Sequence, residues 1–227
     1  MAGTKIVPIT CRLEGPRLVK ACIIVSENRS VLVDAGVSVN DGRIILNKMK
    51  ELDVNPKSVE LCVITHRHFD HTGGPDGAGL KLLKQACDFK IATPQLEANE
   101  IETKTGMKAD FLLKGDEQLR EMPELKVFHV PGHTPGNICL YHEPNRTIIA
   151  GDAIFSAGGW LIAPPPYLCD DPVQAKEGLR KLLNLKVDSV LVTHGEDVLK
   201  DGNLHLALMF AANREEAGQV SPRFSGK

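Results

Sequence analysis

One seven-residue segment, 65–71, constrains the fold and chemistry of this chain more than any other. Its sequence is THRHFDH, so three histidines and an aspartate lie within six residues. The apolar, β-branched run before it predicts a strand that ends at His66. Residues two apart in an extended segment point the same way, so His66 and His68 can bind one metal ion from one side. Imidazole and carboxylate are ligands of zinc and similar divalent ions, and Asp70 and His71 can face a second ion.

Three further candidate ligands stand beside predicted strands elsewhere in the chain. His133 lies in the turn PGHTPG between two predicted strands, and Asp152 and His194 each follow a predicted strand and adjoin a glycine. Glycine lets the backbone bend close to a ligand, and binding residues concentrate on loops at the ends of rigid elements. Any one of the three can be structural on its own. Their shared placement, together with segment 65–71, favours metal ligation.

The rest of the chain divides into alternating predicted strands and helices. We expect strands over 5–13, 19–26, 30–33, 59–65, 90–92, 125–130, 137–142, 147–150 and 189–192. We expect helices over 41–53, 77–87, 94–103, 171–184 and 202–217. Asn40 is the predicted N-cap of the first helix, Pro94 the first-turn residue of the third, and 27–29 a hairpin turn. Residues 104–123 are left unassigned.

This order of elements predicts two packed sheets with helices on the outer faces, in a single domain over 1–220 followed by a short tail over 221–227. With 227 residues, 42% hydrophobic and 25% charged, the composition is that of a globular protein. The net charge of -2 gives no sign of a nucleic-acid partner. Neither a signal peptide nor a membrane span is apparent, so we expect a cytoplasmic protein without a membrane partner.

The six cysteines are predicted to be buried, reduced thiols. Most lie inside apolar runs, none forms a CxxC pair, and their spacing gives no support for a cysteine metal site. Disulfides would be expected in an exported protein, and no export signal accompanies them.

The chain resembles the metallo-β-lactamase superfamily of hydrolases. His66-x-His68-x-Asp70-His71 matches the first motif of that family, and three single residues match the later motifs in the same chain order, His133, Asp152 and His194. The match extends from the segment VLVDAG at 31–36 to the dipeptide HG at 194–195, which is most of the chain. This set of motifs is specific to the superfamily but not to a substrate.

The resemblance implies an α/β protein with a four-layer αββα sandwich and the site at one edge of its two sheets. It implies that one ion is held by His66, His68 and His133, a second by Asp70, His71 and His194, and both by Asp152. Asp34 matches a position near the site in the family. A carboxylate that supports the ligands and one that caps a loop are equally weighted interpretations of Asp34.

Two ions held roughly 3.5–4 Å apart can share a water and lower its pKa towards about 7. The sequence therefore predicts a dinuclear hydrolase that uses a metal-bridging hydroxide, with Asp70 orienting this nucleophile. Zinc is the first choice for both ions, and iron or manganese are alternatives. The predicted substrate is a small molecule, an ester, thioester, lactone or phosphoester. Residues 157–167 form an apolar, proline-rich loop, and Trp160 and Tyr167 make it a candidate substrate wall or a surface packed on the core or on another subunit.

Departures from the family pattern narrow the choice of branch. His68 replaces the carboxylate of the diiron flavoproteins, and true β-lactamases lack a bridging residue such as Asp152. The stretch between His133 and His194 is too short for the large insert of the nucleic-acid-processing branches. Only 33 residues (227 minus 194) follow His194. We therefore expect the helical C-terminal domain of glyoxalase II-like enzymes to be largely absent, although the motifs resemble theirs.

Two other interpretations stay open. A persulfide dioxygenase of this fold uses one iron held by two histidines and an aspartate, which here would be His66, His133 and Asp152. A non-catalytic binding protein could use the metals only to stabilise its fold. Closed structural zinc sites are normally tetrahedral and complete, whereas seven ligands around two ions leave open positions that suit catalysis.

Overall fold

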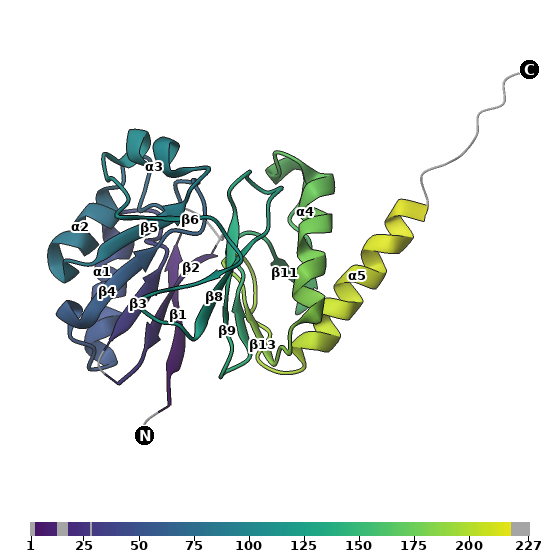
Figure 1. The fold of residues 1–227 in the computed structure, drawn as a ribbon, viewed down its shortest axis with the longest axis horizontal. Coiled ribbons are helices and arrows are strands. Elements are labelled where there is room, and N and C mark those ends of the chain that lie inside the picture. Colours follow the sequence, from purple (N-terminus) through teal and green to yellow (C-terminus); the bar gives the residue numbers. More distant parts are fainter. Residues whose placement is uncertain (1–2, 13–17, 28, 219–227) are drawn as a thin grey trace, which may run out of the picture.

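Two mixed β-sheets pack face to face at the centre of the molecule, and helices cover both outer faces (Figure 1). The computed structural model describes residues 3–12, 18–27 and 29–218. The first sheet has six strands in the order β1-β2-β3-β4-β5-β6, namely Lys5–Arg12, Leu18–Val25, Ser30–Val33, Val59–Val63, Lys90–Pro94 and Phe111–Leu113. The second has five in the order β13-β10-β9-β8-β7, namely Ser189–Leu191, Thr147–Ile149, Ile138–His142, Leu125–His129 and Glu117–Gln118.

Each sheet is antiparallel where the connections between its strands are short and parallel where the connections contain helices. Strands β3 to β6 are parallel, and the connections between them carry α1 (Val39–Glu51), α2 (Ala78–Cys87) and α3 (Ala98–Thr105). In the second sheet only β10 and β13 are parallel. Their connection holds a small hairpin of β11 (Phe155–Ala157) and β12 (Trp160–Ile162), then α4 (Pro172–Gly178) and the 3-10 segment η3 (Leu179–Asn184). Parallel strands need such long crossovers, so this pattern follows from the connection lengths.

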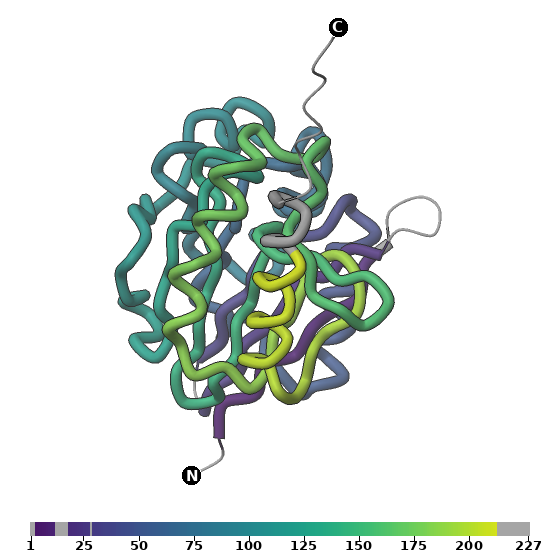
Figure 2. The backbone as a smooth tube through the Cα atoms, turned by 90° about the vertical axis from the view of Figure 1, so that its right-hand side faces the viewer, coloured from purple at the N-terminus to yellow at the C-terminus, as the bar shows by residue number. Residues whose placement is uncertain are grey.

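Buried apolar side chains fill three spaces between the layers. Leu61 and Val63 of β4 join the cluster between the two sheets, while Cys62 of β4 and the following residue, Ile64, join the cluster under α1 and α2. This period of two buries both faces of the strand. A third cluster lies between the second sheet and a layer formed by η3 and by helix α5 (Gly202–Gly218), which Figure 2 shows in front of that sheet. The four-layer αββα sandwich predicted from the sequence is therefore confirmed.

Helix starts were the least accurate part of the sequence prediction. Pro94 does not begin a helix; it ends strand β5, paired with Leu113 of β6, and α3 begins only at Ala98. The chain at Pro94 is extended and buried, so sheet pairing overrides its preference for a first helical turn. Helix α1 is capped by Ser38, whose side chain accepts a hydrogen bond from the Asp41 amide, and not by Asn40.

Other segments differ from the prediction in detail. The helix expected over 171–184 is α4 followed by the 3-10 segment η3, and the unassigned residues 104–123 contain β6 and β7. The six cysteines are free, and all but the half-buried Cys169 are buried, as predicted. The predicted hairpin residue Asn28, the strand end Leu13 and the tail 221–227 lie outside the described residues.

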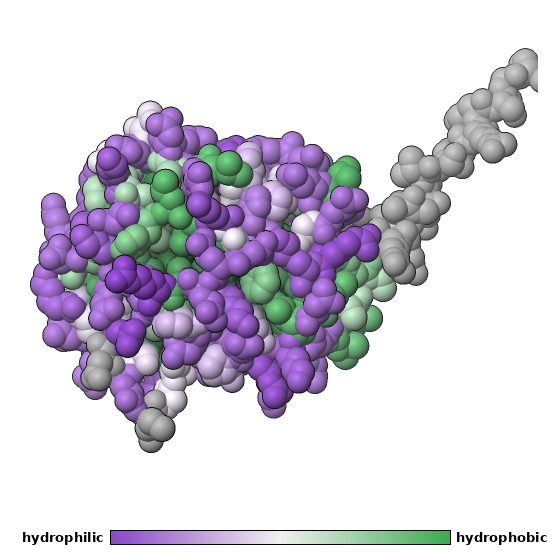
Figure 3. Space-filling model, viewed as in Figure 1, coloured by the Kyte–Doolittle hydropathy of each residue, from purple (hydrophilic) through white to green (hydrophobic). Residues whose placement is uncertain are grey.

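The surface seen from the side of Figure 1 is mostly polar, with apolar side chains gathered in a few patches (Figure 3). Among the described residues, no helix has the length and apolar character needed to cross a membrane.

Candidate metal centre

The predicted site residues meet at one edge of the two sheets, where five connections begin. Residues 65–71 follow β4, and the others follow β3, β8, β10 and β13, namely Asp34, His133, Asp152 and His194. The carboxyl ends of β3 and β4 coincide because these strands are parallel, and those of β10 and β13 coincide for the same reason. Packing of the sheets then brings the two pairs together.

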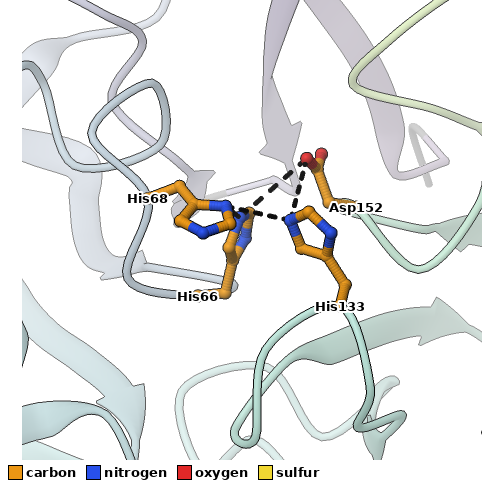
Figure 4. A group of neighbouring side chains, drawn as sticks. All are labelled: His66, His68, His133 and Asp152. Atoms are coloured by element: carbon orange, nitrogen blue, oxygen red, sulfur yellow. Dashed lines mark hydrogen bonds and ion pairs between the residues drawn. The ribbon is translucent and has the colours of Figure 1, made fainter. Parts of the chain in front are cut away.

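Four of these residues form a first ligand group, His66, His68, His133 and Asp152, whose potential ligand atoms all lie within 4.8 Å of one another (Figure 4). The Nδ1 atom of His68 lies 3.0 Å from Nε2 of His66 and 2.9 Å from Nε2 of His133. Oδ2 of Asp152 lies 3.3 Å from Nε2 of His133 and 3.9 Å from Nε2 of His66. One carboxylate oxygen and three ring nitrogens thus converge on a common point.

The protonation of this first group suits a cation. Burial, with further contributions from neighbouring imidazoles, holds the pKa values of His66 and His68 below their ordinary range. Burial likewise lowers the pKa of His133 to about 4. Near neutral pH the three rings are therefore uncharged, and a neutral imidazole carries one N–H and one lone pair. Such a set of lone pairs beside a carboxylate is what zinc and related divalent ions bind.

Three more residues form a second ligand group, Asp70, His71 and His194, also within 4.8 Å of one another. Nε2 of His194 lies 3.4 Å from Oδ2 of Asp70 and 3.3 Å from Oδ2 of Asp152. Nε2 of His71 lies 3.2 Å from Oδ1 of Asp152. Asp152 therefore touches members of both groups. Although His71 Nε2 and Asp152 Oδ1 lie close together, neither of these buried atoms makes a hydrogen bond of good geometry within the described chain, as expected where a cation belongs.

Protonation distinguishes the second group from the first. Burial acts to lower the pKa of His194, but hydrogen bonds to Asp152 and Asp70 outweigh it and raise the pKa to about 9. Burial is likewise outweighed at His71, where the charges of Asp34 and Asp152 raise the pKa. Burial alone would raise the pKa of Asp70, but the hydrogen bond to His194 and the charge of His71 lower it. Without a metal ion, protons on His71 and His194 supply the positive charge that balances the carboxylates.

Asp34 supports the second group and also caps the strand next to it. Its buried carboxylate lies 2.7 Å from Nδ1 of His71. It also accepts hydrogen bonds from the backbone amide of Thr65, at 2.8 Å, and from the Thr65 hydroxyl. By accepting from Nδ1, Asp34 leaves Nε2 of His71 facing the site, which is how outer carboxylates orient histidine ligands. Asp34 thus contacts both a predicted ligand and the loop after β4, and its support of a metal ligand stays a prediction.

Arg67, inside the first motif, was not singled out from the sequence, yet it links several parts of the site. Its guanidinium forms ion pairs with Asp170, with Glu100 at 3.2 Å and with the buried Glu97 at 3.6 Å. Glu97 in turn accepts a hydrogen bond from the amide of Gly136, at 2.9 Å. Arg67 thus connects the first motif to the turn that carries His133. The partners lie 30 to 103 residues away in sequence, so no local pattern indicates them.

The turn of His133 also depends on close packing against α4. Gly132 has φ +128°, and a Cβ there would lie 2.1 Å from the amide nitrogen of Ala175. The amides of Asp170 and Asp171 donate to the carbonyls of His133 and Gly132. The glycine beside His133 is therefore required by both backbone conformation and space.

A cavity of about 750 Å³ opens over both ligand groups. Its lining includes the ligands His68, Asp70, His133, Asp152 and His194. Of the two aromatic residues in the predicted wall, Tyr167 lines the cavity, whereas Trp160 lies outside it and packs against His205. Phe155, which the sequence analysis missed, stacks on His194 with ring centroids 5.0 Å apart. The structure thus brings together all seven predicted ligands, and their binding of metal stays a prediction.

Comparison with known proteins places this geometry in context. A family model described as the metallo-beta-lactamase superfamily matches residues 15–194. A probable metallo-hydrolase, YflN of Bacillus subtilis (strain 168), is 24% identical over 198 residues, which cover 73% of this chain and 75% of the relative. A hydroxyacylglutathione hydrolase of Pectobacterium carotovorum subsp. carotovorum is 29% identical over 77% of this chain but only 60% of its own length.

A solved structure of similar fold is the metallo-beta-lactamase FIM-1 from Pseudomonas aeruginosa in its mono-zinc form. Its TM-score is 0.71 at 18% sequence identity, and the match covers 96% of this chain and 93% of FIM-1. At this identity the likeness concerns the fold alone.

Proposed function

Because this chain belongs to the metallo-beta-lactamase superfamily, we propose that it is a hydrolase that binds two divalent metal ions, zinc before iron or manganese. The family match and the cluster of histidines and aspartates support a metal-dependent hydrolase in general. The number of ions, their identity and the substrate belong to the proposal. Zinc is favoured by the imidazole-rich ligand set.

The observation that carries the proposal is that two ligand groups share one carboxylate. Nε2 atoms of His133 and His194 each lie 3.3 Å from Oδ2 of Asp152. We assign one ion to His66, His68 and His133, the other to Asp70, His71 and His194, and a bridging role to Asp152. Two ions bound in this way would lower the pKa of a shared water and polarise the bond to be cleaved.

Asp70 has the position of a group that orients the nucleophile. Its carboxylate borders the cavity and faces Nε2 of His194. Its lowered pKa keeps it ionised, so it can accept a hydrogen bond from a water in the cavity. We expect Asp70→Asn to lower kcat by about 100-fold or more, within the range of general acid–base contributions. Near-normal turnover in an Asp70→Asn protein that retains two ions would contradict this role.

For the substrate we propose a carboxylic ester, thioester or lactone ahead of a phosphoester. The relative from Pectobacterium carotovorum is named for hydrolysis of hydroxyacylglutathione, an acyl compound. The family is shared, but this chain spans 60% of that relative, so the same substrate does not follow.

The iron dioxygenase interpretation requires only His66, His133 and Asp152. The assembly of the second group, Asp70, His71 and His194, favours two ions over one. Elemental analysis of protein purified without added metal distinguishes the two. We expect about two ions per chain, followed by hydrolysis in a panel of thioesters, lactones and phosphoesters. A single iron per chain, with oxygen consumption on a persulfide, would replace the hydrolase proposal.

A further inference from the structure

Several exposed apolar side chains line the wall of the cavity over the two ligand groups. Large hydrophobic residues that are more than a third exposed are scattered over the described chain, but five of them border this cavity, Leu18, Phe69, Ile162, Tyr167 and Leu168. Tyr167 is the most exposed, at 85%. Contiguous exposed apolar surface beside a polar site is typical of a ligand pocket.

Backbone contacts hold this wall in place. Tyr167 lies in the 3-10 turn Pro166–Leu168, which two prolines precede, and the amide of Leu168 donates to the carbonyl of Pro165. The amide of Asp170 then bonds to the carbonyl of His133. The wall is therefore tied to a ligand of the first group. Because its backbone is already held, a ligand would have only side chains of the wall to order.

The charged side chains that line the cavity also restrict the kind of substrate that it can bind. Apart from the Tyr167 phenol, the ionisable side chains that line the cavity are candidate metal ligands, namely His68, Asp70, His133, Asp152 and His194. No lysine or arginine appears among the described residues that line it. Recognition of a phosphate or of a carboxylate remote from the reacting bond normally uses such cations.

On these grounds, and given the proposed hydrolase function, we infer that the substrate is an uncharged acyl compound with a medium-length apolar chain. Its carbonyl lies over the two ligand groups, and its chain lies against Tyr167, Leu168 and Ile162. Cleavage adds water across the acyl bond: the hydroxyl joins the carbonyl carbon, and the leaving thiol or alcohol takes the proton. Anionic acyl donors, such as glutathione thioesters, and phosphoesters are disfavoured.

Three thioesters of 2-mercaptoethanol test this inference with one small leaving group. They carry an acetyl chain, an octanoyl chain, and a suberyl chain that ends in a carboxylate. We expect kcat/KM for octanoyl to exceed that for acetyl by about 50-fold, which corresponds to about three buried methylenes. The suberyl thioester should fall to near the acetyl value. No dependence on chain length, or equal rates for octanoyl and suberyl, would overturn the inference.

Variants of the wall test where the chain binds. Tyr167→Ala and Leu168→Ala should each lower the octanoyl-to-acetyl ratio by about three- to tenfold. The matched control is Trp160→Ala, which removes an exposed aromatic side chain outside the cavity and should leave the ratio unchanged. An unchanged ratio in both wall variants would contradict the assigned binding surface.

Binding measured without turnover separates this inference from the proposed function. Calorimetric titration of the metal-loaded protein with octanamide and acetamide should show tighter binding of octanamide, weakened in Tyr167→Ala. A protein that holds two ions but cleaves no thioester would refute the acyl-hydrolase proposal. Binding of octanamide would still show whether the wall binds an apolar chain.

Discussion

The two ligand groups are built from similar side chains but differ in how they balance charge. In the first group, His66, His68 and His133 have lowered pKa values and offer lone pairs at neutral pH. In the second, His71 and His194 have raised pKa values and carry protons. The first group is thus ready for a cation, whereas the second must lose protons before it can bind one.

Exposure differs less between the two groups. The side chains of His66 and His71, one in each group, are fully buried, and that of His194 is 20% exposed. Both groups border the cavity, the first through His68 and His133 and the second through Asp70 and His194. From the difference in protonation we therefore expect the first group to hold its ion tightly and the second to bind more weakly.

Substitution of Asp152 should weaken metal binding by both ligand groups. We expect Asp152→Asn to reduce the metal content to below one ion per chain, because its carboxylate contacts both groups. The loss of kcat/KM should exceed the roughly 10- to 100-fold effect of changes in the partners of metal ligands. Elemental analysis and thioester kinetics measure both, with Asp88→Asn as a control at the far end of α2. Full metal content in Asp152→Asn would rule out its bridging role.

Substitution of a single histidine in either group should affect the two metal ions differently. We expect His194→Gln to retain one tightly bound ion per chain and His133→Gln to lose that ion while weakening the other. Both variants should be almost inactive, since each lacks half of the centre. Titration of metal-free protein with zinc and a chelating indicator distinguishes the two. Identical isotherms for the two variants would contradict the difference between the groups.

The pH dependence of metal binding should show the same difference. At pH 7 the first ion should displace no histidine proton, because the pKa of His133 is about 4. The second ion should displace one proton each from His71 and His194, whose pKa values are raised, to about 9 in His194. Raising the pH from 6 towards 9 should therefore strengthen the second step and leave the first unchanged. Calorimetry in buffers of different ionisation heat counts these protons, and equal proton release in both steps would refute the assignment.

The sequence predicted the ligands because each marks an abrupt change of pattern. His66 and His194 interrupt apolar β runs, and His133 and Asp152 stand beside glycines that turn the chain. The αββα layers followed from alternating buried strands and helices. Long-range contacts leave no such local trace. The stacking of Phe155 on His194 joins two connections, and the burial of Pro94 in β5 depends on pairing with β6.

Because Asp34 contacts His71, its substitution should mainly weaken binding of the second ion, and by less than the histidine substitutions. We expect Asp34→Asn to weaken the second ion by about 10- to 100-fold, because His71 loses the carboxylate that orients its ring. The first ion should bind almost as before, although Thr65 also contacts His66, at 3.2 Å. Zinc titration of the variant measures both steps. Equal weakening of the two steps would show that Asp34 supports the whole centre.

The smallest predicted effect concerns Arg67, which bridges the ligand turns without contacting either metal position. We expect Arg67→Gln to keep two ions and to lower the unfolding free energy by about 1 kcal/mol, since Asp170 and Glu100 lie at the surface. Such a loss lowers the Tm by roughly 2–4 °C in a chain of this size.

The loss of unfolding free energy in Arg67→Gln should depend on pH, because Glu97 stays buried without the guanidinium of Arg67. Burial already raises the pKa of Glu97, and loss of Arg67 removes a charge that opposes this rise. A carboxyl with a raised folded-state pKa stabilises the fold at low pH and loses that contribution as pH rises. Arg67→Gln should therefore be more destabilised at pH 8 than at pH 5. Thermal unfolding at both pH values tests this, with the double variant Arg67→Gln/Glu97→Gln as the control that should remove the pH dependence. A pH-independent cost would mean that Arg67 acts through Asp170 and Glu100 alone, and that the two ligand turns are held together by their backbone contacts.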